Sequence, residues 1–71
     1  MRELDERELE ALRLFASGKT TDEMAVSLVV HRSVAQHYLR VATRKLGARN
    51  RVHAVAIAVQ RGLLEITDDD G

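Results

Sequence analysis

The stretch TTDEMAVSLVVHRSVAQHYLR, residues 20–40, decides the fold of this chain. Its apolar residues recur at helical spacing in two groups, which are Met24, Ala25 and Leu28, and then Ala35, Tyr38 and Leu39. Val30 falls between the two groups, and the small side chain of Ala25 lets a second helix cross the first closely. This pattern predicts a short helix, a tight turn and a longer helix, which is the spacing of a helix-turn-helix motif.

Start and stop signals divide the rest of the chain into helices. N-terminal capping patterns occur at three places, which are Asp5 with Glu8, Thr20 with Glu23, and Asn50. A glycine follows three of the apolar runs and can end a helix in the left-handed conformation, at Gly18, Gly47 and Gly62. The sequence therefore predicts an all-α, compact four-helix domain with helices over residues 6–16, 21–28, 32–46 and 51–61.

The apolar stripes of these helices predict the core. In the first helix the stripe consists of Leu9, Leu12 and Ala16, with Phe15 beside it. In the third helix it consists of Ala35, Tyr38, Leu39, Ala42 and Leu46, which fall within one narrow sector at about 100° per residue. We expect both aromatic residues of the chain, Phe15 and Tyr38, to be buried.

Length and composition limit the function. The 71 residues suffice for one domain, which we expect over residues 1–66, followed by a flexible acidic tail over residues 67–71. The chain has no cysteine, and its histidines lack metal-ligand spacing, so we expect no metal and no cofactor. It contains no nucleophile elbow, phosphate-binding loop or paired carboxylates, which argues against an enzyme. Without a membrane span or signal peptide, we expect a cytoplasmic protein without membrane contact.

Charge is distributed unevenly along a chain whose net charge is zero. Residues 1–23 carry four basic and seven acidic groups, and residues 65–71 carry four acidic groups. Residues 24–64 carry seven basic groups and no acidic group. Because salt screens charges beyond about 8–10 Å, a phosphate backbone would meet mainly the local positive field of the middle segment. The alternative is a set of ordinary solvated helix faces.

The side of the third helix opposite its apolar stripe carries no acid. It presents Ser33, Gln36, His37, Arg40 and Arg44. Glutamine can read adenine and arginine can read guanine in the major groove, whereas an ordinary exposed face usually mixes Glu with Lys. We therefore expect this helix to be a recognition helix for double-stranded DNA. The complete set of expected DNA-binding residues is Thr20, Thr21, Arg32, Ser33, Gln36, His37, Arg40, Arg44 and Lys45.

Three segments of the chain resemble the C-terminal DNA-binding domain of the LuxR-type regulators. They are LDERELEALRLFASGKTTDEMA (residues 4–25), the region from Leu28 to Leu39, and RKLGARNRVHAVAIAVQRGLL (residues 44–64). The resemblance covers residues 4–64 without a gap. It implies a sequence-specific DNA-binding domain of a transcriptional regulator, including response regulators, without a small-molecule ligand in this domain. It also implies RNA polymerase as a further partner.

The recognition helix departs from the family pattern at two positions. The ungapped alignment places His31 where the family usually has the capping Ser, and Gln36 where it usually has a Lys. Histidine caps less well than serine, and Gln36 removes one cation from the expected interface. A register shifted by one residue would instead align Ser33, Val34 and His37 with the family's Thr, Val and His. Because that shift needs an insertion before Lys45, we prefer the ungapped alignment.

The fourth helix is apolar on nearly all sides, and the resemblance implies that it carries a dimer contact. We expect a homodimer through Val52, Val55, Ala56 and Val59, which recur at i, i+3, i+4 and i+7. The alternative is that all four belong to the core. For the whole domain, the alternative function is a degenerate helix-turn-helix that acts as a protein-interaction or dimerisation module.

Overall fold

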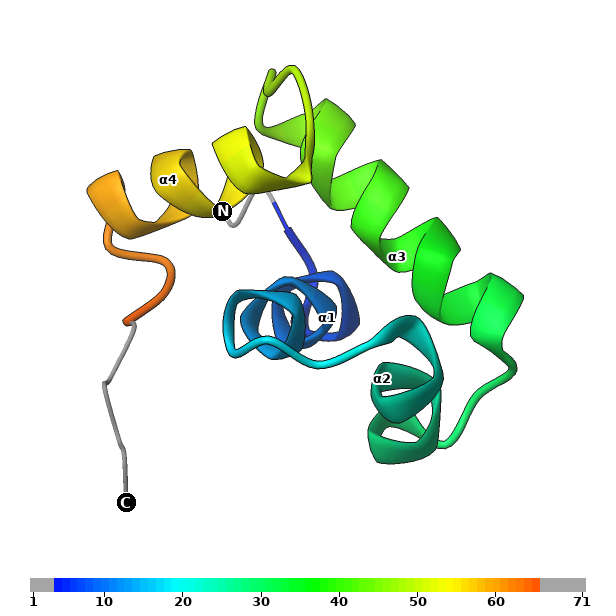
Figure 1. The fold of residues 1–71 in the computed structure, drawn as a ribbon. Helices are drawn as coiled ribbons and strands as arrows, with labels where there is room; N and C mark the ends of the chain where they lie inside the picture. Colours follow the sequence, from blue (N-terminus) through cyan, green and yellow to red (C-terminus); the bar gives the residue numbers. More distant parts are fainter. Residues whose placement is uncertain (1–3, 66–71) are drawn as a thin grey trace.

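The computed structural model describes residues 4–65 and contains four helices in this part of the chain. They are α1 (Glu6–Ala16), α2 (Thr21–Leu28), α3 (Arg32–Lys45) and α4 (Arg51–Gln60). Helix α1 lies in the middle and packs against the other three, while α2 and α4 lie at opposite ends of the domain (Figure 1). The predicted all-α fold with four helices is confirmed. The expected tail over residues 67–71 lies outside the described residues.

Side-chain caps set the beginning of each helix. The backbone N–H of Glu8 donates to Asp5 Oδ1 at 2.9 Å, and the N–H of Glu23 donates to Thr20 Oγ1 at 3.1 Å. In both cases the glutamate carboxylate accepts from the backbone N–H of the cap, so both predicted capping boxes are present. Asn50 caps α4 through its Oδ1, as predicted. Helices α3 and α4 end one residue earlier than predicted, because Leu46 and Arg61 are their C-caps.

The turn between α2 and α3 contains an unusual backbone conformation. Val29 adopts φ 58° and ψ 49°, the left-handed region that β-branched residues avoid. This conformation lets the N–H of Val30 donate to the carbonyl of Ala25 at 3.0 Å, which closes the end of α2. The chain is thereby turned sharply enough for α3 to pack back against α2.

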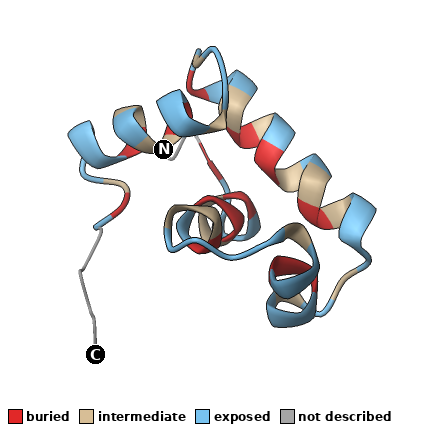
Figure 2. Ribbon diagram, viewed as in Figure 1, coloured by how far each residue is buried: buried red, intermediate tan, exposed pale blue. Residues whose placement is uncertain are grey.

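The core lies where α1 meets the other helices (Figure 2). Its buried apolar residues are Leu4, Ala11, Leu12, Leu14, Met24, Ala25, Ala35, Leu39, Ala42, Leu46, Ala54, Ala58 and Leu64. The contribution of α3 and α4 is largely alanine, whose small side chain allows helix axes to approach closely. No helix within residues 4–65 has the length and apolar character needed to cross a membrane.

Burial differs from the prediction on α1 and for the aromatic residues. Ala11 and Leu14 are buried, while Leu9, Phe15 and Ala16 are only half-buried. The buried face of α1 is therefore rotated from the expected stripe toward Glu8 and Ala11, because α1 packs against all three other helices. Tyr38 is also half-buried rather than buried, and its hydroxyl oxygen accepts a hydrogen bond from Arg7 Nη1 at 3.2 Å.

Candidate nucleic-acid interface

Helix α3 presents its polar face on the side away from the core. Ala35, Leu39 and Ala42 are completely buried against the domain. Of the predicted recognition residues, Gln36 is half-buried and the others are exposed, namely Ser33, His37, Arg40 and Arg44. The five side chains therefore share one accessible face without an acidic residue on it.

His31 caps the recognition helix with its side chain. Its Nδ1 accepts a hydrogen bond from the backbone N–H of Ser33 at 3.2 Å, and it also lies 3.0 Å from Ser33 Oγ. A ring nitrogen that accepts from a backbone N–H carries no proton of its own. His31, which stands where the family usually has serine, thus still caps α3, and it also contacts the hydroxyl of Ser33.

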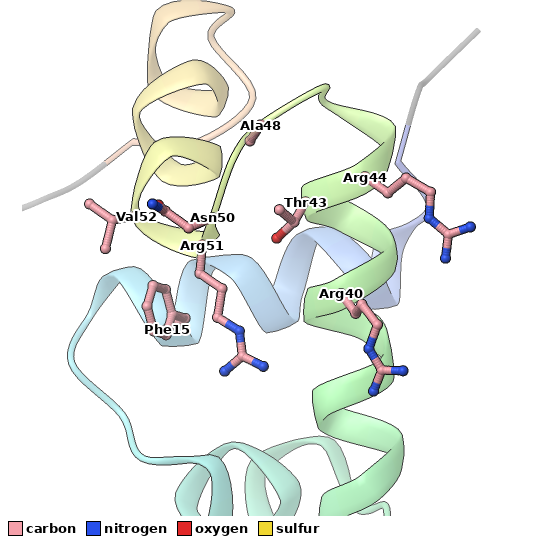
Figure 3. A pocket seen from close by; sticks show the side chains of 8 residues that line it. All are labelled: Phe15, Arg40, Thr43, Arg44, Ala48, Asn50, Arg51 and Val52. Carbon is pink, nitrogen blue, oxygen red and sulfur yellow. The ribbon is translucent and has the colours of Figure 1, made fainter.

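A groove of about 690 Å³ runs between the C-terminal half of α3 and the start of α4 (Figure 3). Arg40 and Arg44 line it from α3, and Arg51 lines it from the first position of α4. Its remaining lining is Phe15, Thr43, Ala48, Asn50 and Val52, and none of the lining residues is acidic. Arg51 was not among the residues expected from the sequence, although the acid-free segment 24–64 contains it.

Two other predicted cations hold positions within the fold. Lys45 Nζ lies 2.9 Å from Oε1 of the buried Glu8, which links α3 to α1. Arg32 Nε lies 3.5 Å from Asp22 Oδ1 in an exposed ion pair between α3 and α2. The Lys45 ammonium and the Arg32 guanidinium are therefore each paired with a carboxylate. Arg40 and Arg44 have no such partner within residues 4–65.

Thr20, one of the two predicted DNA contacts at the start of α2, makes hydrogen bonds with Glu23 of the same helix. Thr20 Oγ1 accepts from the N–H of Glu23, while the N–H of Thr20 donates to Glu23 Oε1 at 2.8 Å. This backbone hydrogen bond lowers the pKa of the Glu23 carboxyl, and Lys19 lowers it further. Thr21 occupies the first helical position and is half-buried.

Helix α4 has a buried face and an exposed apolar face. Ala54 and Ala58 are completely buried, whereas Val52 is 71% exposed and Val59 is 41% exposed. Ala56 is exposed and Val55 is half-buried. The alternative that all four predicted contact residues belong to the core is therefore wrong for the single chain.

The short α2, the tight turn and the longer α3 with its exposed polar face define a helix-turn-helix domain. The profile described as "Bacterial regulatory proteins, luxR family" matches residues 2–58. The chain belongs to this family, as the resemblance predicted. The family consists of transcription regulators and is not a family of enzymes.

Individual relatives support the same assignment. The chain is 42% identical over 62 residues to "Transcriptional activator protein PhzR" of Pseudomonas fluorescens, which covers 87% of this chain and 25% of the relative. It is 41% identical over 59 residues to "Response regulator RamR" of Streptomyces coelicolor, covering 83% of this chain and 29% of the relative. The chain thus spans about a quarter of the length of the curated relatives it matches.

A solved structure shares the fold. "Structure of Transcription factor, GerE" superposes with a TM-score of 0.87, covering 92% of this chain and 97% of that chain. Its sequence identity is 22%, so this comparison shows the arrangement of the helices rather than the role of any residue. The structural likeness confirms the predicted fold class.

Proposed function

We propose that this chain is the DNA-binding domain of a LuxR-type transcriptional regulator and that α3 reads the major groove of duplex DNA. The observation that carries the proposal is the acid-free polar face of α3. That face lies opposite the buried Ala35, Leu39 and Ala42 and stays accessible in the folded domain. In helix-turn-helix proteins, the second helix of the motif lies in the major groove and contacts base edges, and the first helix holds it in place.

The geometry favours a division of contacts along α3. Gln36 and His37 lie within the first two turns, where recognition helices approach base edges, and both can hydrogen-bond to bases. Arg44 lies in the last turn and lines the groove, which suits a contact to phosphate. Arg40 lies between them and can serve either kind of contact.

The remaining expected residues surround this helix. Ser33 and Arg32 begin α3, and Thr20 and Thr21 begin α2, where backbone N–H groups and the helix dipole favour phosphate. We add Arg51 to the interface because it lines the same groove as Arg40 and Arg44. We assign Lys45 mainly to the fold, since its ammonium pairs with the buried Glu8.

The exposed face of α4 supports a homodimer as part of the proposal. Val52, Ala56 and Val59 are accessible in the single chain and lie at helical spacing. A two-fold dimer through this face would present two α3 helices to two half-sites. The proposal further includes a cytoplasmic location and contact with RNA polymerase, as befits a bacterial transcription regulator.

A protein-interaction module remains the second candidate, because Gln36 replaces the lysine usual in the family and the net charge is zero. Affinity for duplex DNA measured against salt separates the two functions. We expect binding whose salt slope falls by about one unit in Arg40→Ala and stays unchanged in the control Arg13→Ala, which lies on α1. A chain that binds no duplex at low salt would overturn the DNA-binding proposal and favour the interaction module.

A further inference from the structure

One imidazole nitrogen at the start of α3 contacts both hydrogen-bond donors of Ser33. His31 Nδ1 lies 3.2 Å from the backbone nitrogen of Ser33 and 3.0 Å from its Oγ. The backbone N–H can only donate, so Nδ1 is the acceptor of that hydrogen bond and carries no proton. The hydroxyl must then donate its own proton to Nδ1, because a lone pair of Oγ facing the lone pair of Nδ1 would repel it. Both donors of Ser33 are thereby committed to His31.

This arrangement limits what the Ser33 side chain can offer to a ligand. A serine hydroxyl that rotates freely can donate or accept, as its partner requires. With its proton directed at His31, Ser33 Oγ presents only lone pairs to its surroundings. Ser33 is exposed, and its side chain has no other hydrogen-bond partner within residues 4–65. Ser33 is consequently an acceptor on the accessible face of α3.

We propose that His31 makes Ser33 selective for an adenine or a cytosine at one position of the DNA site. The inference rests on the proposed function, in which α3 lies in the major groove. There adenine presents its N6 amino group and cytosine its N4 amino group, whereas guanine presents O6 and thymine presents O4 as acceptors. A serine that can only accept binds the amino groups and is repelled by the carbonyl oxygens. His31 acts as a positioning residue, because it determines this preference without contacting the base.

The place of Ser33 in α3 suits a base contact. It is the second residue of the helix, and the N-terminal residues of a recognition helix are those that contact base edges. A phosphate oxygen only accepts hydrogen bonds, so a hydroxyl whose proton is already donated is a poor phosphate ligand. At this end of α3, a side-chain contact with phosphate therefore falls to the exposed Arg32 rather than to Ser33.

The test compares the base preferences of the full chain and its variants on duplexes selected from a random pool, at mildly alkaline pH, where imidazole is neutral. We expect the parent to prefer adenine or cytosine over guanine or thymine about threefold to tenfold at one position. His31→Gly removes the acceptor, and glycine replaces a capping side chain at little cost to the helix. The hydroxyl then rotates freely, so the preference should fall below about twofold.

Two further variants separate the proposed role of His31 from a merely structural one. His31→Asp keeps a group at the cap that can only accept, so the preference should persist although the added charge weakens binding to all sequences. Ser33→Ala should abolish the preference at the same position, and adding His31→Gly to it should change nothing further there. The control Ser27→Ala, an exposed serine on α2, should leave the preference intact.

The inference is overturned if His31→Gly weakens all sequences equally and keeps the base preference of the parent. It is also overturned, while the proposed function stands, if the chain binds DNA and Ser33→Ala changes no preference. A second readout needs no DNA, because nitrogen NMR shifts of the His31 ring show which nitrogen carries the proton. We expect the proton on Nε2, and a proton on Nδ1 rejects the inference. If no version of the chain binds duplex DNA, the proposed function and the base preference fail together, and the ring signals still show whether His31 holds Ser33 as an acceptor.

Discussion

Lys45 Nζ lies 2.9 Å from Glu8 Oε1 and joins the last turn of α3 to the first turn of α1. The same oxygen of Glu8 accepts the backbone N–H of Asp5 at 3.2 Å. One buried carboxylate therefore closes the cap of α1 and holds the far end of the recognition helix. Since α3 must keep a fixed orientation to enter a groove, this ion pair links the stability of the fold to the geometry of the interface.

Loss of the lysine should leave a buried carboxylate without its partner. We expect Lys45→Met to lower the free energy of unfolding by about 1–2 kcal/mol, because Lys45 is itself partly exposed and solvent replaces some of the lost interaction. Urea denaturation measures the change. The control Arg44→Met alters the neighbouring exposed residue and should cost less than about 0.5 kcal/mol. Identical denaturation midpoints for parent and Lys45→Met would show that the ion pair does not support the fold.

This ion pair also marks what the sequence could not reveal. The caps at Asp5, Thr20 and Asn50 were predictable because each depends on residues three positions apart. Glu8 meets Lys45 across 37 residues, and the local capping pattern that identifies Glu8 reveals neither its burial nor this partner. The sequence consequently predicted helix boundaries to within one residue but placed Lys45 among the groups available to DNA.

The strained turn offers a second prediction. Val29 holds a left-handed conformation with its side chain 86% exposed, so the side chain gains little from packing. We expect Val29→Gly to raise the free energy of unfolding by about 1 kcal/mol, because glycine adopts positive φ without steric cost. Thermal unfolding of the two proteins measures this. The control Val26→Gly changes an exposed valine inside α2 and should lower stability, since glycine is a poor helix former.

A Val29→Gly variant that melts below the parent would mean that the valine side chain makes a stabilising contact in solution. The turn itself was predictable from Val30 and the spacing of the apolar groups, but its φ angle was not. A glycine or asparagine at position 29 would have indicated a left-handed backbone conformation there. Likewise, the position of Arg51 beside Arg40 follows from the packing of α4 on α1 and α3, which no local pattern encodes.

The exposed face of α4 leads to a prediction about self-association. If the proposed dimer forms through this face, Val59→Asp should weaken it at least tenfold, because a charge would then be buried without a partner. Helix content should stay nearly unchanged, since Val59 is partly exposed in the single chain. Sedimentation velocity over a range of concentrations measures both proteins. Val26→Asp serves as the control, because Val26 is also an exposed valine, 78% exposed against 41% for Val59, but lies on α2. If parent and Val59→Asp are both monomeric at high micromolar concentration, the isolated domain does not dimerise through this face.

The proposed recognition helix should contain two kinds of contact that substitution can separate. Gln36 lies near the start of α3 and Arg44 near its end, beside the groove. Gln36→Ala should weaken binding to a preferred site by about 1–3 kcal/mol and relax the preference at one base position. Arg44→Ala should weaken binding to all sequences about equally and lower the salt slope by about one unit, because one phosphate contact is lost.

Affinity measured against salt, for a preferred duplex and a scrambled duplex, distinguishes these effects. The preferred duplex comes from selection of binding sites from a random pool. Val26→Ala is a suitable control, because Val26 is exposed on α2 and should change neither preference nor slope. We expect Gln36→Ala to lose affinity in a way that depends on the DNA sequence, and Arg44→Ala to lose affinity in a way that depends on salt. The reason is that base edges and phosphates are contacted by different ends of α3. If neither Gln36→Ala nor Arg44→Ala changes binding to the preferred duplex, α3 does not read DNA, and its acid-free face must serve another partner.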